Sequence, residues 1–176
     1  MKNNLFLITA ALFLSTHAYA STLYESLSHQ SSVPFIVETV TDSSKDKKVD
    51  TTALKAAVEK ALFERKSIHF KQATDSKDAH LKVSIDVKNY YWSDHDPVDM
   101  LMGVGGAAMD AAVIEDYAFM QADVRIVDNK DKMIWSESVT STITKKDMPA
   151  DKAIVLINDD FAKSFVKSAF SKKRSA

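Results

Sequence analysis

The chain has 176 residues, of which 45% are hydrophobic, and its 23 Lys and Arg residues nearly balance its 24 Asp and Glu residues. This balance gives no support for binding to nucleic acid or to an anionic membrane surface, both of which attract strongly basic proteins. The chain has no cysteine, so we expect neither a disulfide nor a lipid-modified cysteine.

The first twenty residues are expected to be a signal peptide. Lys2 is positively charged, an apolar run extends from Leu5 to Leu14, and Ala18-Tyr19-Ala20 has the small-x-small pattern that signal peptidase recognises. The apolar run is about ten residues long, whereas a membrane span needs about twenty. We therefore expect cleavage after Ala20, a periplasmic mature chain beginning at Ser21, and no membrane anchor after cleavage.

The mature chain is expected to form one domain. Residues 21–32 are predicted to be a flexible arm and residues 172–176 a basic tail, on either side of a single domain at 33–171. The β-branched run at 33–40 predicts a strand, and Asp50 or Thr51 can cap a helix that runs to about Arg65. A short strand is predicted at 67–72.

Alternating polar and apolar residues then predict three longer strands, at 80–92, 117–128 and 133–144. A final helix is predicted from Pro149 to about Phe170. The order is strand, helix, four strands, helix. This order predicts an α+β fold, a two-layer sandwich with a mainly antiparallel five-stranded sheet and two helices on one face.

The residues between two of these strands, 93–116, form an unusually long insertion that holds every glycine of the chain. Gly103, Gly105 and Ala108 match the G-x-G-x-x-A of a dinucleotide-binding turn. That turn belongs to a parallel sheet covered on both faces, but the strand after the insertion alternates like a half-exposed antiparallel strand. We therefore expect no cofactor.

The insertion is instead expected to contact a partner, because flexible methionines and small residues suit an adaptable binding surface. The expected contact residues are Met100, Leu101, Met102, Gly103, Val104, Gly105, Gly106 and Met109. The alternative, that the insertion folds back over its own sheet, remains open from the sequence. Tyr90 and Trp92 are expected to continue the exposed face of their strand, where they either pack against neighbouring groups or bind a ligand.

The stretches "AHLKVSIDV" and "ADVRIVDNKDKMIWSESVTSTI" resemble a pattern in small bacterial envelope proteins, many of them lipoproteins. Similar domains are the amino-terminal domain of TolB, the curli-secretion lipoproteins and the lipoprotein activators of peptidoglycan synthases. The resemblance spans Val33 to Phe170, with its distinctive part from Ala122 to Ser138, and it implies a non-catalytic envelope role. The turn lacks the usual glycine, so Asn129 or Asp131 is expected to adopt the left-handed conformation.

No catalytic motif is recognisable, and no metal is expected. Only "SDHDP" places a histidine, His95, between carboxylates, and neighbouring residues in a loop rarely point at one metal ion. We therefore expect a non-catalytic periplasmic interaction module that serves a cell-envelope or secretion assembly by binding other envelope proteins. The alternative is a small-ligand or cell-wall glycan-binding protein that uses Tyr90 and Trp92. The sequence does not decide whether the chain self-associates.

Overall fold

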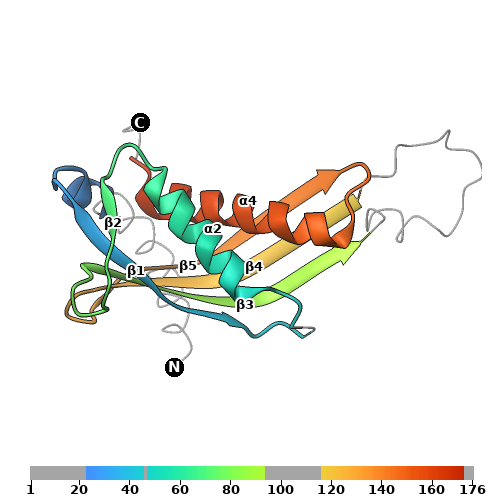
Figure 1. Ribbon diagram of the computed structural model, residues 1–176, viewed down its shortest axis with the longest axis horizontal. Coiled ribbons are helices and arrows are strands. Elements are labelled where there is room, and N and C mark those ends of the chain that lie inside the picture. Colours follow the sequence, from blue (N-terminus) through green and yellow to red (C-terminus); the bar gives the residue numbers. More distant parts are fainter. Residues whose placement is uncertain (1–22, 46, 94–115, 173–176) are drawn as a thin grey trace, which may run out of the picture.

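The computed structural model describes residues 23–45, 47–93 and 116–172, which form a five-stranded sheet with its helices on one face (Figure 1). The elements are β1 Val33–Asp42, α2 Thr51–Phe63, β2 Phe70–Gln72, β3 Leu81–Ser93, β4 Asp116–Asp128, β5 Met133–Lys145 and α4 Ala150–Phe170. The strands lie side by side in the order β2-β1-β3-β4-β5. The predicted α+β two-layer fold is confirmed.

The sheet is mixed, and not antiparallel throughout. β1 runs parallel to both of its neighbours, β2 and β3, whereas β3, β4 and β5 pair antiparallel. The parallel pair of β1 and β2 follows from the helix between them, because a strand, a crossover helix and a second strand return the chain in the same direction. β3 then enters on the other side of β1.

Helices α2 and α4 begin where the sequence predicts. The Asp50 side chain accepts hydrogen bonds from the N–H groups of Thr52 at 2.9 Å and Ala53 at 3.1 Å, which caps α2. Pro149 immediately precedes the first residue of α4. Proline has no backbone N–H, and none is needed at the start of a helix, where N–H groups have no partner within the helix. The apolar stripe of α4 is buried against α2, β5 and β4.

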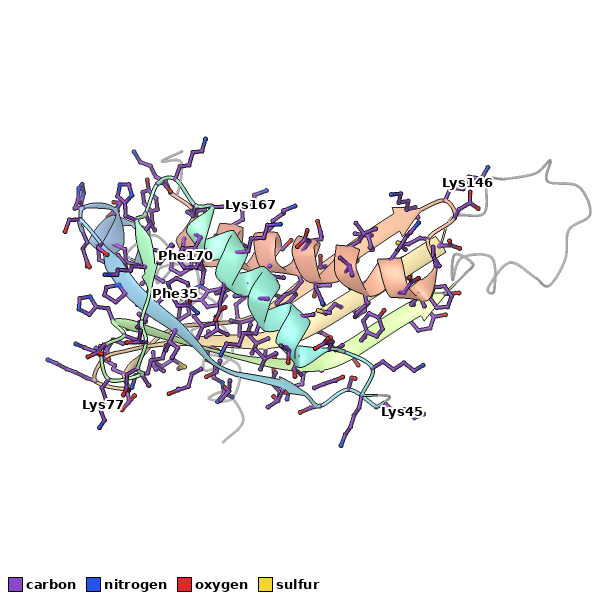
Figure 2. The ribbon with its side chains drawn as sticks, in the orientation of Figure 1. Phe35, Lys45, Lys77, Lys146, Lys167 and Phe170 are labelled. Atoms are coloured by element: carbon purple, nitrogen blue, oxygen red, sulfur yellow. The ribbon has the colours of Figure 1, made fainter. Side chains whose placement is uncertain are left out.

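The core fills the space between the helices and the sheet. Ile85 of β3 and Phe161 of α4 are almost completely buried, at 1% and 0% exposure. Aromatic rings pack together here: Phe35 and Phe70 of the sheet have a centroid distance of 5.7 Å, and Phe70 lies 5.1 Å from Phe170 of the helix layer. Figure 2 shows Phe35 and Phe170 inside, with the lysine side chains at the periphery.

Part of the predicted N-terminal arm is packed. Residues 23–28 form a short helical segment, and its Leu23 and Leu27 belong to the hydrophobic core. Tyr24 also packs against the core. The prediction of a flexible arm at 21–32 is therefore wrong for residues 23–28, because two leucines one helical turn apart give this segment an apolar face to bury.

The turn between β4 and β5 adopts the conformation expected without glycine. Asp131 has a φ angle of 59°, which is the left-handed region that a short polar residue tolerates. Asp128 holds the turn, because its carboxylate accepts the N–H groups of Lys130 at 2.8 Å and Lys132 at 2.9 Å. The hydrogen bond from Lys132, with that from Lys130, lowers the pKa of Asp128. Lys82 of β3 donates to Asp131 at 2.6 Å.

Candidate functional site

The two central strands β3 and β4 lead directly into the long insertion. They stay paired up to Ser93 and Tyr117, so the chain enters and leaves residues 94–115 from one end of the sheet. The predicted partner-binding residues Met100, Leu101, Met102, Gly103, Val104, Gly105, Gly106 and Met109 lie outside the described residues. The candidate site is therefore built from the strand ends that carry the insertion.

A β-bulge at Lys88 decides which faces the aromatic residues near this end occupy. Alternate residues of β3 are buried up to Val87, and the register with β4 then shifts between Val87 and Asn89. One extra residue reverses the alternation, so Tyr90 and Trp92 lie on the helix-covered face. The prediction that they continue the exposed face is wrong.

Tyr90 and Trp92 pack against the hydrophobic core from the end of β3. The Trp92 indole N–H donates to the backbone carbonyl of Met148 at 3.0 Å, and burial raises the pKa of Tyr90. These contacts agree with the expectation that the two residues pack against neighbouring groups. Their use in ligand binding stays a prediction, with less surface available for it than the sequence suggested.

Three other aromatic residues occupy the open face at this end, and we call Tyr91, Tyr117 and Phe119 the aromatic patch. Tyr91 lies opposite Phe119 across the β3–β4 pair, and its ring centroid is 6.3 Å from that of Tyr117. Tyr91 is 41% exposed, and the other two are partly exposed. Sequence reasoning missed this patch, although the facing sequences "NYYW" and "YAF" are its visible signal.

The start of α4 is tied to the same end of the sheet. The carboxylate of Asp116, the first residue of β4, accepts the backbone N–H of Met148, whose carbonyl accepts from Trp92. Met148 itself is only 1% exposed. Both strands that carry the insertion are therefore hydrogen-bonded to the segment before α4.

The middle of the open face is polar, and its groups bond to one another. Thr41 donates to Asp86 at 3.0 Å, and Lys88 also bonds Asp86, which lowers the pKa of that carboxyl. Asn89 donates to Gln121 at 2.8 Å. A hollow of about 150 Å³ lies among these strands, lined by Thr39, Thr41, Ser84, Ile85, Asp86, Lys88, Asp123 and Arg125. These polar side chains, which bond to one another, lie between the aromatic patch and the opposite end of the sheet.

A larger groove lies at that opposite end, between the helical segment at 23–28 and the β4–β5 turn. Its volume is about 420 Å³. Its lining combines apolar side chains with a polar rim and consists of Leu23, Ser26, Leu27, Gln30, His80, Leu81, Asp128, Asn129, Lys132, Met133 and Ile134. Met133 is 59% exposed there. None of the residues predicted to bind a partner or ligand lines this groove.

The described residues contain no cluster of three His, Cys, Asp or Glu side chains arranged to hold a metal ion. His95 and its two flanking aspartates lie outside them. Over the same described ranges, no helix has the length and apolar character needed to cross a membrane. β4 lies between two antiparallel neighbours, which agrees with the argument against a dinucleotide-binding turn before it.

No protein-family model matches the chain, and neither does any curated protein. A hypothetical protein from Chlamydia trachomatis has a similar structure, with 8% identity, a TM-score of 0.47, and 77% of this chain and 92% of that chain covered. PelC from Paraburkholderia phytofirmans, a dodecamer, is similar at 10% identity and a TM-score of 0.46, with 78% and 86% covered. A minor lipoprotein from Acinetobacter baumannii is similar at 11% identity and a TM-score of 0.38, with 77% and 92% covered. These TM-scores are below 0.5, so no function follows from them.

Proposed function

We propose that this chain is a non-catalytic interaction module, exported to the bacterial periplasm, that binds another protein of the cell envelope. The export half of the proposal is supported by the charged, apolar and Ala-Tyr-Ala segments of the first twenty residues. The binding half is supported by the end of the sheet where β3 and β4 meet the insertion.

The aromatic patch is the observation that carries the proposal. Tyr91, Tyr117 and Phe119 stand together on the open face of the sheet, beside its polar middle and next to the ends of the Met- and Gly-rich insertion. Tyrosine and phenylalanine are enriched in protein interfaces because they bury a large area and lose little conformational freedom. An exposed aromatic group of this kind, next to a polar surround, is typical of a protein-binding surface.

The hydrogen bonds at this end of the sheet support the same proposal. Paired strands and the Trp92 and Asp116 bonds to Met148 hold the patch in one position before any partner arrives. A surface that is already ordered loses less entropy on binding, so more of the contact energy contributes to affinity. The insertion then supplies adaptable methionine contacts beside a fixed aromatic platform.

A non-catalytic role is supported by the way the polar groups of the open face are used. Asp86 is held by Thr41 and Lys88, and Gln121 is held between Asn89 and Ser138. Groups in such a network stabilise a polar sheet surface. A catalytic nucleophile or base instead needs a partner that activates it and a pocket for the reacting atoms.

Position-specific photocross-linking tests the proposal. A photoreactive amino acid replaces Tyr91 in one strain and Val155 of α4, which is 61% exposed, in a matched control strain. We expect irradiated cells to give a covalent adduct with an envelope protein at position 91 and none at position 155. Absence of an adduct at 91, or the same adducts at both positions, would contradict docking at this end.

The contribution of the insertion is tested separately with the Met100→Ser, Met102→Ser and Met109→Ser triple variant. If the insertion contacts the partner, this variant loses the adduct at position 91 while its denaturant midpoint stays that of the wild type. An unchanged adduct would limit the docking surface to the aromatic patch.

A further inference from the structure

β5 is the outermost strand of the sheet among the residues that the structure describes. It pairs with β4 on one side only, and from Trp135 to Lys145 this pairing is regular, after a single bulge at Ile134. The other side of such a strand presents a row of backbone N–H and C=O groups that a further strand can pair with. The long, regular shape of β5 makes this side suitable for strand addition.

The side chains of β5 do not protect this edge. Natural edge strands are usually guarded by charged residues, proline or repeated bulges. Between Trp135 and Lys145 the only charged residue is Glu137, whose carboxylate accepts the Ser168 hydroxyl of α4. The open-face positions carry only hydroxyl groups, from Ser136, Ser138, Thr140, Thr142 and Thr144.

We propose that a second copy of this chain pairs antiparallel along β5, with the two-fold axis at Val139. This register places Val139 opposite Val139 of the second copy. It also places Ser138 opposite Thr140, and Glu137 opposite Ser141, of the second copy. Like residues or hydrogen-bonding residues then face one another. Moving the axis to Glu137 would set two carboxylates side by side, and moving it to Ser138 would set Glu137 against Val139.

The helix layer is compatible with the same axis. Asp160 and Ser168 of α4 bond Ser141 and Glu137 of β5, so Ser164 lies level with Val139. Because α4 packs over β5 and β4, two copies of it would lie about 10 Å apart, close to the 8–10 Å of packed helices.

The facing sides of these two helices are complementary in size and charge. Ser164, a small residue, lies at the axis and permits close approach. Lys167 shares the side of Asp160, seven residues away, and would come level with Asp160 of the second copy. Each copy therefore supplies one member of each of two reciprocal charge pairs, which is what an isologous interface requires.

Sedimentation equilibrium on the full mature chain tests this proposal with Thr140→Lys and a matched control, Thr39→Lys, on the open face of β1. Two lysines brought together across the axis repel, so Thr140→Lys should raise the dimer dissociation constant about tenfold or more. Thr39→Lys should leave it unchanged, and denaturant midpoints check that both variants are folded. A monomer at every concentration, a dimer that Thr140→Lys leaves intact, or equal weakening by Thr39→Lys overturns the proposal.

Cross-linking gives an independent readout, because the chain has no cysteine of its own. In the proposed register Thr140 lies diagonally across from Thr140 of the second copy, with side chains about 7–8 Å apart. A short bis-maleimide should therefore link Thr140→Cys into a dimer and leave Thr39→Cys monomeric. Linkage at position 39 in place of 140 would assign the contact to the other edge of the sheet and overturn the proposal.

Discussion

The carboxylate of Asp42 organises the loop between β1 and α2. Its two oxygens accept the N–H groups of Ser44 and Val49, each at 2.9 Å. Burial pushes the pKa of Asp42 upward, but the Ser44 hydroxyl and these N–H groups outweigh it and hold the pKa below its ordinary value. The charged form is therefore favoured in the folded protein.

The Asp42→Asn variant tests this residue. Because the folded pKa is depressed, the stabilisation is present above the unfolded value of about 4 and is lost as the pH falls through the folded value. We expect the variant to lose about 1–2 kcal/mol of unfolding free energy at pH 7. In denaturant titrations from pH 7 to pH 3, the difference from the wild type should shrink below pH 4. A difference that is constant with pH would contradict this role for the charge.

At the scale of the elements, α4 and β3 supply the core through the residues that the sequence pattern identifies. Phe161→Ala and Ile85→Ala should each lower the unfolding free energy by about 2–5 kcal/mol, because both leave cavities in a packed core. Leu156→Ala, on the same helix at 36% exposure, should cost no more than about 0.5–1 kcal/mol. Equal costs for Leu156 and Phe161 would mean that the helix face is assigned wrongly.

The bulge at Lys88 makes a second prediction at this scale. In a Trp135→Phe background Trp92 is the remaining tryptophan, and its packing against the core should give blue-shifted emission with weak acrylamide quenching. Deleting Lys88 removes the extra residue and leaves Asn89 opposite Gln121, so Trp92 should stay on the helix-covered face and keep its blue-shifted emission and weak quenching. Red-shifted emission and stronger quenching in a folded deletion variant would show that Lys88 is not the extra residue and would contradict the bulge.

The same bulge explains where sequence reasoning succeeded and where it failed. Alternation predicts β3, β4 and β5, and the stripe on α4 predicts its buried face, since both patterns are local. One extra residue in β3 is invisible to alternation, because tyrosine and tryptophan fit either face of a strand. The side-by-side position of β1 and β3 joins segments far apart in the chain, so no local pattern reveals it. The aromatic patch was missed for the first of these reasons, because the bulge places Tyr91 on the open face beside Tyr117 and Phe119.

At the scale of the whole molecule, the proposal requires export and release. Mass spectrometry of the protein purified from its native envelope should find Ser21 at the N-terminus, with no added acyl mass. A high-salt or mild chaotrope wash should release it from membranes, because protein contacts yield to such treatment. An intact Met1 form that resists extraction would contradict the proposed periplasmic location.

Docking through the aromatic end of the sheet is the central claim, and recovery of partners from cross-linked envelopes tests it most directly. Wild type, the Tyr91→Ser and Tyr117→Ser double variant, and Val155→Ser as control are purified in parallel, and the proteins that accompany them are quantified by mass spectrometry. The account predicts that the amount of partner recovered with the double variant falls at least about tenfold, equivalent to about 1.4 kcal/mol of binding free energy. The control should recover as much partner as the wild type, and the denaturant midpoints of both variants should stay at the wild-type value. Full recovery of the partners by the folded double variant would contradict it.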